Sequence, residues 1–184
     1  MKTYFSDNLI IPENALNIYT TNAQAMQINK IIKIYADSSS VITDATACIG
    51  GNSVFFIKDF KRVNLVEKDY SNFKILKMNT GCPNTTYNCS YLWIKFMLIQ
   101  DIIYFDPPWG GSEYKSKKKI DLFLDDVNIL DIIDELYNYT KIVALKVPNN
   151  FNVFKIEDNF WLHKIYNITK CKKNIYKLII FYKR

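Results

Sequence analysis

The chain has 184 residues, of which 49% are hydrophobic and 23% charged, and its formal net charge is +6. This composition excludes an intrinsically disordered chain and fits one domain around a single core. Four cysteines without a Cys-x-x-Cys spacing and a single histidine argue against a Cys/His zinc site, so we expect no bound metal.

The first half of the chain alternates between helical and strand patterns. Apolar residues at helical spacing predict an amphipathic helix over Ala23–Tyr35. The apolar run Val41–Asp44 predicts a strand that ends in an acid, and the pair Gly50-Gly51 then leads into a second helix. Val63–Glu67 predicts another strand that ends in an acid, and Tyr70–Asn79 has a helical pattern.

The second half continues this alternation and ends in two strand-like segments. We expect a strand over Thr86–Cys89, a helix over Tyr91–Leu98 and a strand over Ile102–Phe105. A helix over Val127–Tyr137 and a strand over Ile142–Val147 should follow, and then a hairpin of Phe160–Thr169 with Ile175–Tyr182. Such a chain predicts a Rossmann-like α/β fold. Its seven-stranded sheet is mostly parallel, with helices on both faces and an antiparallel C-terminal hairpin at the edge. We expect Trp93 in the core, Trp161 in the core or in packing at the sheet edge, and His163 at the surface or in packing.

Acids and glycines at the ends of the first two predicted strands favour a nucleoside cofactor. Asp44 precedes the Gly50-Gly51 turn, where the backbone allows close approach of a ligand. Glu67 follows about 20 residues beyond that turn, where an acid can accept both ribose hydroxyls. Each feature alone also fits a tight turn or a surface acid, and the lack of a Gly-x-Gly-x-x-Gly motif argues against NAD.

The strongest signal is Asp106-Pro107-Pro108-Trp109, directly after the predicted strand Ile102–Phe105. The exocyclic amino group of a base is a poor nucleophile, because its lone pair is delocalised into the ring. A carboxylate and a proline-fixed carbonyl supply two acceptors that hold this nitrogen, and a tryptophan offers a stacking face. The competing interpretation is a rigid Pro-Pro turn beside a buried tryptophan. The pattern favours methylation of a base amino group.

Basic residues gather in two parts of the chain. Residues 141–184 contain ten Lys or Arg and two acids, a net charge of +8, and a second cluster comprises Lys115, Lys117, Lys118 and Lys119. Any one of these lysines is also explained by a solvated surface. Together they favour an anionic partner such as a nucleic acid.

The motifs resemble those of trimethylguanosine synthases, the RNA cap guanine-N2 methyltransferases. Residues 106–114 resemble the family's (Ser)-Pro-Pro-Trp-Gly-Gly-Pro-Asp-Tyr segment, and residues 44–52 its Asp-Ala-Phe-Cys-Gly-x-Gly-Gly-Asn loop. Residues 66–69 resemble its Ile-Asp-x-Asp stretch, and residues 145–150 its Leu-Pro-Arg-Asn turn. Phe5-Ser6 and residues 19–22 resemble segments before the family's first core helix, so the similarity covers nearly the whole chain.

The resemblance implies a class I methyltransferase that uses S-adenosylmethionine and acts on the 7-methylguanosine cap of RNA. The residues expected at the cofactor are Thr20, Asp44, Thr46, Gly50, Gly51, Asn52, Glu67, Ser90 and Asp106. The catalytic residues are then Asp106, Pro107 and Trp109, and the substrate contacts are Tyr4, Phe5, Trp109, Lys115, Lys146 and Asn149. We expect residues 1–22 to contribute to the cap and cofactor site of a methyltransferase domain over residues 23–184. The expected protein is a monomer without membrane contact.

Three departures from the family pattern keep other functions open. Asp106 stands where the family has Ser, Cys48 replaces a glycine, and Asn149 replaces an arginine. Asp106 makes the motif also resemble that of adenine-N6 methyltransferases acting on RNA or DNA. The altered loop also fits a non-catalytic, methyltransferase-like RNA-binding subunit. With no signal peptide and no long apolar run, we expect an intracellular protein, cytoplasmic or nuclear, of a kind that suits a large DNA virus.

Overall fold

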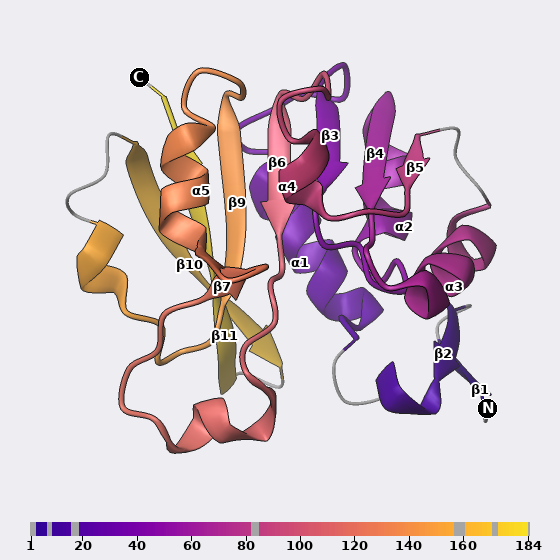
Figure 1. Cartoon of the computed structure of the whole chain (residues 1–184), viewed down its shortest axis with the longest axis horizontal. Helices are drawn as coiled ribbons and strands as arrows, with labels where there is room; N and C mark the ends of the chain where they lie inside the picture. The colour runs from indigo at the N-terminus through magenta and orange to yellow at the C-terminus, as the bar shows by residue number, and fades with distance from the viewer. Residues whose placement is uncertain are drawn as a thin grey trace.

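A seven-stranded sheet with helices on both faces forms the body of the protein (Figure 1). The structure is a computed structural model that describes residues 3–6, 9–15, 19–81, 85–156, 161–170 and 173–183. The sheet order is β10-β11-β9-β6-β3-β4-β5. In chain order these strands are β3 (Val41–Asp44), β4 (Arg62–Val66), β5 (Thr86–Tyr87), β6 (Ile102–Phe105), β9 (Ile142–Val147), β10 (Leu162–Lys170) and β11 (Lys173–Tyr182). The predicted Rossmann-like fold is confirmed.

The predicted antiparallel C-terminal hairpin lies at the edge of the sheet and consists of β10 and β11. Strands β3, β4, β5, β6 and β9 are parallel, and β11 pairs antiparallel with both β9 and β10. The antiparallel strand therefore lies inside the sheet. The edge strand β10 runs in the same direction as the parallel set.

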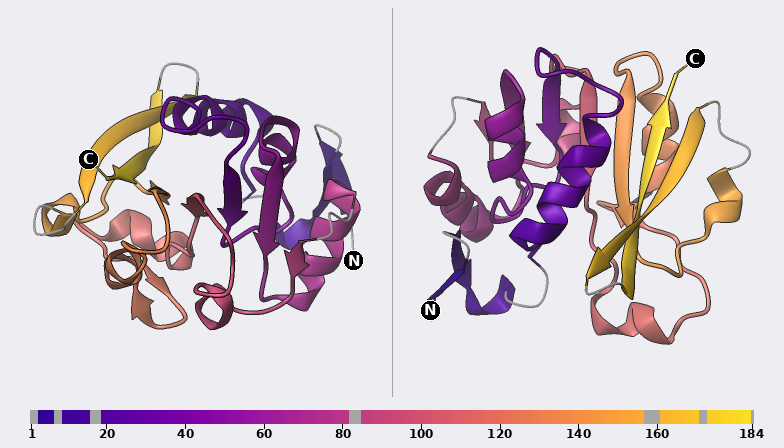
Figure 2. Two further views of the ribbon diagram at one scale, coloured as in Figure 1. Left: turned by 90° about the horizontal axis from the view of Figure 1, so that it is seen from above. Right: turned by 180° about the vertical axis from the view of Figure 1, so that it is seen from behind.

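Helices on the two faces enclose two apolar cores. The helices are α1 (Asn22–Ile32), α2 (Ser53–Asp59), α3 (Tyr70–Thr80), α4 (Tyr91–Ile94) and α5 (Ile129–Glu135). Figure 2, in the view from above, shows α1 and α2 on one face of the sheet and α4 and α5 on the other. Along β6, Ile103 and Phe105 enter the core under α4 and α5, whereas Ile102 and Tyr104 enter the core under α1 and α2. Because both faces are covered, this strand is apolar throughout.

The predicted helix over Tyr91–Leu98 is shorter than expected, and the prediction for Trp93 is wrong. Helix α4 has only four residues, and its Tyr91 fills the core side with 2% exposure. Trp93 lies two residues, or about 200°, further around the helix and is 77% exposed. The predictions for Trp161, which is buried, and His163, which is exposed, are confirmed.

An N-terminal hairpin that the sequence patterns did not predict packs beside the first glycine turn. It consists of β1 (Thr3–Ser6) and β2 (Leu9–Pro12), followed by the 3-10 turn η1 (Glu13–Ala15). Leu9 and Ile11 form a small core with Ile49. The side chain of Asn79 on α3 donates to the carbonyls of Ile10 and Ile49 at 3.1 and 2.7 Å. In the part of the chain that the structure describes, no helix is long and apolar enough to cross a membrane.

Candidate active site

The polar residues singled out from the sequence converge at the carboxyl edge of the parallel strands, the lower end in Figure 1. Asp44 ends β3, Glu67 and Asp106 directly follow β4 and β6, and Ser90 lies beyond β5. The backbone N–H of Asp106 donates to the hydroxyl of Thr46 at 2.7 Å. This bond connects Asp106-Pro107-Pro108-Trp109, which we call the acceptor motif, to the first loop, which joins β3 to α2. The parallel arrangement of the strands thus brings four separate segments of the chain to one place.

The first loop is a close-packed turn between β3 and α2. Gly50 has a φ of +94°, and a Cβ on Gly51 would lie 2.8 Å from the carbonyl oxygen of Thr20. Asn52 donates to the hydroxyl of Thr20 at 3.1 Å. Cys48, at the family's glycine position, adopts a φ of +50° in the left-handed region. The loop keeps its glycine-like geometry despite this substitution, and the segment before α1 lies against it.

Asp44 is a buried acid with an oxygen available for a ligand. Its Oδ2 accepts a hydrogen bond from the hydroxyl of Ser53 at 2.6 Å. Its Oδ1 is buried and meets no donor within bonding geometry among the described residues. Burial raises the pKa of this carboxyl to about 7, and the negative charges of Asp106 and Glu67 add to the shift. A buried acceptor surrounded by further acids fits a cationic ligand group.

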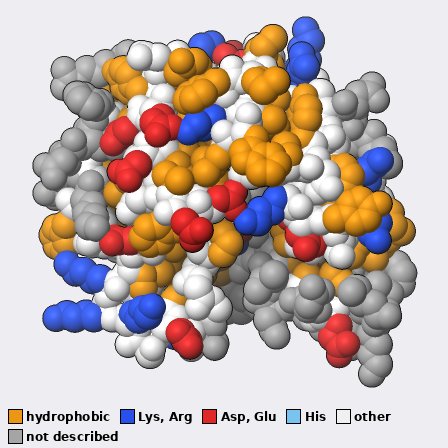
Figure 3. Space-filling view, viewed as in Figure 1, with side chains coloured by type: hydrophobic (Ala, Val, Ile, Leu, Met, Phe, Trp, Pro, Cys, Tyr) orange, Lys and Arg blue, Asp and Glu red, His pale blue; other side chains and the backbone are white. Residues whose placement is uncertain are grey.

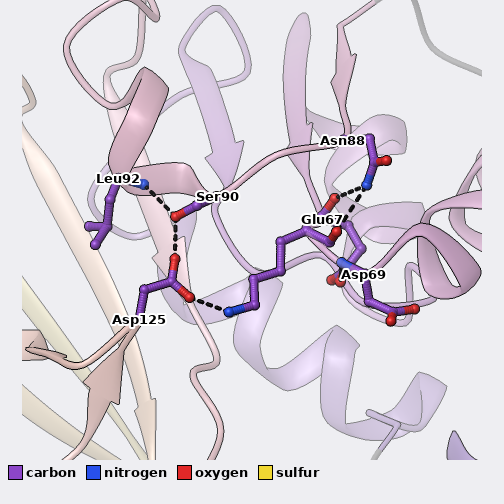
Figure 4. A network of polar contacts seen from close by, with 7 residues as sticks. Glu67, Asp69, Asn88, Ser90, Leu92 and Asp125 are labelled. Carbon is purple, nitrogen blue, oxygen red and sulfur yellow. Dashed lines mark hydrogen bonds and ion pairs between the residues drawn. The ribbon is translucent and has the colours of Figure 1, made fainter.

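The carboxylate of Glu67 is fixed by the two loops beside it. Its oxygens accept the backbone N–H groups of Cys48 at 2.8 Å and of Asp69 at 2.7 Å. Burial raises the pKa of Glu67, although these two hydrogen bonds oppose the shift. Asn88 donates to the carbonyl oxygen of Glu67 at 2.8 Å (Figure 4). Each carboxylate oxygen has a second lone pair, so the fixed group retains acceptor capacity for hydroxyls.

Asp125 contacts Ser90, one of the residues expected at the cofactor, and was not itself predicted at the site. The hydroxyl of Ser90 donates to the carboxylate of Asp125, which also pairs with Lys68 (Figure 4). Asp125 and Asp126 both have positive φ in the turn between β7 (Phe123–Leu124) and β8 (Val127–Asn128). Consecutive aspartates, which tolerate this conformation, were the available signal. The contact brings this turn over Ser90, which is buried and caps α4.

The acceptor motif leaves β6 with its first proline buried and its tryptophan partly buried. Trp109 has edge contacts with Tyr114 and Tyr176, at centroid distances of 5.3 and 6.0 Å. Its Nε1 is buried and meets no acceptor in the described part of the chain. Tyr176 comes from β11 and was not predicted at the site. The tryptophan is therefore fixed between the loop after β6 and the C-terminal hairpin.

Lys146 lies within the site and contacts the acceptor motif. It is 5% exposed, and its Nζ lies 2.7 Å from Asp106 Oδ2 and 3.0 Å from Thr20 Oγ1. The ammonium also lies over the rings of Trp109 and Tyr176, at 5.5 and 4.7 Å from their centroids. Lys146 was predicted as a substrate contact, whereas the structure pairs its ammonium with the carboxylate of Asp106.

Two further expected substrate contacts, Lys115 and Asn149, lie outside this cluster. Lys115 is exposed on the 3-10 turn η2 (Gly111–Ser116), and Asn149 is exposed after β9, where its carbonyl accepts a hydrogen bond from Lys177. Tyr4 and Phe5 are on β1, but their side chains lie outside the described residues. Among the residues that the structure describes, no cluster of His, Cys, Asp and Glu has a metal-binding arrangement.

Comparison with known sequences identifies the family. The family model described as RNA cap guanine-N2 methyltransferase matches residues 39–182, most of the chain. The curated relative "Uncharacterized protein L320" of Acanthamoeba polyphaga mimivirus is 36% identical over 140 residues. That match covers 71% of this chain and 53% of the relative, so the chain spans about half the length of the relative.

Solved structures show the same fold. A candidate methyltransferase from Porphyromonas gingivalis W83 aligns with a TM-score of 0.70 at 11% identity, over 96% of this chain and 44% of that one. A candidate RNA methyltransferase from Pyrococcus horikoshii aligns with a TM-score of 0.62 at 18% identity, over 99% of this chain and 94% of that one. TYW2 from M. jannaschii, solved in complex with AdoMet, aligns with a TM-score of 0.56 at 13% identity, over 98% of this chain and 84% of that one. The chain therefore belongs to the RNA cap guanine-N2 methyltransferase family.

Proposed function

We propose that this enzyme methylates the exocyclic N2 of the guanosine at an RNA cap. The observation that carries the proposal is the position of Asp106-Pro107-Pro108-Trp109 at the end of β6, beside the acids of the neighbouring strand ends. The Gly110-Gly111 extension and the family match favour guanine N2 over other base amines.

The acids at the strand ends suit S-adenosylmethionine, which supplies an electrophilic methyl group on a positively charged sulfur. Asp44 Oδ1 is the acceptor for the ammonium of the methionine moiety, and Glu67 is the acceptor for the ribose hydroxyls. Thr46 and the loop from Gly50 to Asn52 line the cofactor, with Thr20 behind the loop. Ser90 lies on the adenine side. Three nearby carboxylates make this cradle favourable for a cation.

Asp106 and Pro107 prepare the acceptor nitrogen. One oxygen of Asp106 is held by Lys146, and its side chain remains 20% exposed. The other oxygen and the carbonyl of Pro107 accept the two N–H groups of the amine, which turns the nitrogen lone pair toward the methyl donor. Bound S-adenosylmethionine would supply the methyl group as an electrophile, and Asp106 would accept the proton that the methylated nitrogen releases. Trp109 stacks on the base.

The N-terminal segment completes the site in this proposal. Thr20 lies against the cofactor loop, and its hydroxyl accepts hydrogen bonds from both Asn52 and Lys146. The backbone of β1 carries Tyr4 and Phe5, our candidates for the second aromatic face of the base. A positively charged 7-methylguanine between two aromatic rings is a favourable cation–π arrangement.

Methylation of adenine N6 is the second candidate, favoured by the charged Asp106 in place of serine. Labelled S-adenosylmethionine is incubated with four RNAs of one sequence: uncapped, capped without the 7-methyl mark, capped with it, and capped with every internal adenosine replaced. The Trp109→Ala enzyme is the control. Our proposal predicts label only on capped RNA, independent of adenosine content. Equal transfer to uncapped RNA, or loss of transfer with the adenosines, contradicts it.

A further inference from the structure

Four lysines in a run of five residues form an exposed basic strip next to the acceptor motif. Lys115, Lys117, Lys118 and Lys119 are all exposed on η2 and the loop that follows it, and Glu113 is the one acid in residues 111–120. Figure 3 shows Lys and Arg side chains gathered at the lower left of the molecule, where this loop lies. No step of the proposed methyl transfer uses Lys117, Lys118 or Lys119. The strip therefore has unused capacity for an anion.

The loop that carries the strip is held in place by the segment after β9. The side chain of Asn150 donates to the carbonyls of Tyr114 and Lys117 at 2.7 and 2.8 Å. Ile120 N–H donates to the carbonyl of Asn150 at 3.0 Å, and Ile120 forms a β-bridge with Phe151. Ile120 and Phe151 are both buried. These contacts fix the backbone beneath the lysines, which lowers the entropy cost of binding there.

An exposed aromatic ring lies at the far end of the strip. Phe154, on the 3-10 turn η3 (Val153–Ile156), is 62% exposed. The ammonium of Lys119 lies 4.1 Å from the centroid of its ring. An aromatic face beside a cation is the combination that binds an unpaired base and its phosphate. Double-stranded RNA offers no such face, because its bases are stacked on one another.

The strip is continuous with the acceptor site. Trp109, on which the methylated base would stack, contacts the ring of Tyr114 at a centroid distance of 5.3 Å. Lys115 follows directly and lies over the outer part of the same tyrosine, 5.9 Å from its centroid. From there the lysines lead along the loop to Phe154. The order is thus the acceptor tryptophan, then phosphate-binding lysines, then a second stacking face.

We infer that Lys115, Lys117, Lys118, Lys119 and Phe154 bind the single-stranded RNA that follows the methylated nucleotide. The lysines contact its phosphates, and one unpaired base stacks on Phe154. This inference rests on the proposed function for its choice of RNA as the polymer. It adds that the substrate is a chain with several unpaired nucleotides after the cap, which the enzyme recognises without reading their sequence.

Fluorescence anisotropy with a labelled, uncapped single-stranded RNA of about ten nucleotides tests the strip without any methyl transfer. We expect Phe154→Ala to weaken binding about tenfold, since stacking of one base is worth roughly 1 to 3 kcal/mol, and Phe154→Tyr to preserve it. Replacing Lys117 and Lys118 by Ala should lower the slope of log K against log salt by about 0.7 for each lysine. Phe96→Ala is the aromatic control. Phe96 is also exposed, at 50%, and has Lys95 over its ring. It lies before the amino end of β6, away from the carboxyl ends of the strands where the basic strip lies.

The charge control replaces two exposed lysines by Ala: Lys58 in the last turn of α2, and Lys61 between α2 and β4. Binding that is equal in the strip variants and both controls would overturn the inference, as would a polyglutamate peptide that binds as tightly as the RNA. Methylation of a cap dinucleotide is measured in parallel. Strip variants should leave it unchanged while raising KM for a longer capped RNA. Failure of cap methylation alone would overturn the proposed function and leave the RNA-binding result standing.

Discussion

Lys146 and Asp106 form an ion pair across the carboxyl ends of β9 and β6, with 2.7 Å between Nζ and Oδ2. The register of the two strands places Phe105 opposite Leu145, so the paired residues are the next cross-strand position. The same offset places Asp101 opposite Lys141, just before the amino ends of β6 and β9. Their Oδ1 and Nζ atoms lie 2.8 Å apart. The side chain of Lys146 is only 6% exposed, whereas that of Lys141 is 76% exposed. The chain thus contains a buried pair and an exposed pair on the same two strands.

We predict that Asp106 and Lys146 act as a unit. Asp106→Asn leaves a buried ammonium without its counter-charge, so it should lower the free energy of unfolding by on the order of 3 kcal/mol. The double variant Asp106→Asn with Lys146→Met should recover much of this loss. Urea unfolding measures both. The same substitutions at Asp101 and Lys141 should each cost less than about 1 kcal/mol. Additive effects at the buried pair would contradict the prediction.

The raised pKa of Asp44 predicts that cofactor affinity depends on pH. In the free enzyme this carboxyl is protonated below about pH 7, and a cationic ligand favours its ionised form. The dissociation constant of S-adenosylmethionine should therefore fall about tenfold between pH 6 and pH 8, with release of a proton. Calorimetry in buffers of different ionisation enthalpy measures both quantities. Asp44→Asn should give weaker binding without pH dependence, and a wild-type affinity that is constant over this range would refute the assignment.

The same group predicts how stability changes with pH. The folded-state pKa of Asp44 lies above its unfolded value of 3.8, so the folded chain binds more protons between these values. The contribution of Asp44 to stability is therefore complete below about pH 4 and is lost as the pH rises through about 7. Between pH 4 and pH 8 the unfolding free energy of the wild type should fall relative to that of Asp44→Asn, which has no titrating group at this position. A wild-type curve parallel to that of the variant would contradict the pKa shift.

Two glycines separate steric from conformational effects near the cofactor loop. A Cβ on Gly51 would lie 2.8 Å from the backbone of Thr20, whereas a Cβ on Gly81, which has a φ of +71°, would meet no described residue beyond its chain neighbours within 4 Å. We expect Gly51→Ala to cost about 1 to 3 kcal/mol of stability and to weaken cofactor binding. Gly81→Ala should cost about 1 kcal/mol and leave binding unchanged. Thermal denaturation and calorimetry measure these effects. An equal effect of both variants on cofactor affinity would show that the loop does not need its contact with Thr20.

The fold was predictable because the strands of a doubly covered parallel sheet are short apolar runs, and each of their carboxyl ends carries a conspicuous residue. Asp44, Glu67 and Asp106 each follow such a run directly. Trp93 was misplaced because periodicity did not show where a four-residue helix ends. The N-terminal hairpin was missed because β1 and β2 have only four residues each, too few for a period to be visible.

The site was only partly predictable, since its remaining contacts depend on register and on distant segments. Lys146 was predicted only as a substrate contact, and the pairing of β9 with β6 shows that it faces Asp106. Asp125 and Tyr176 reach the site from a turn and from the inserted antiparallel strand. No local pattern reports such contacts, because they form between residues 35 or more positions apart.

Identification of the methylated nucleoside tests the central claim most directly. Capped RNA is incubated with labelled S-adenosylmethionine, digested to nucleosides, and analysed by chromatography with mass spectrometry, with Glu67→Gln as a control for cofactor binding. We predict that the label is recovered in N2-methylated guanosine derived from the cap, and that Glu67→Gln lowers the yield at limiting cofactor. Label in N6-methyladenosine, or on guanosines within the RNA chain, would contradict the proposed function.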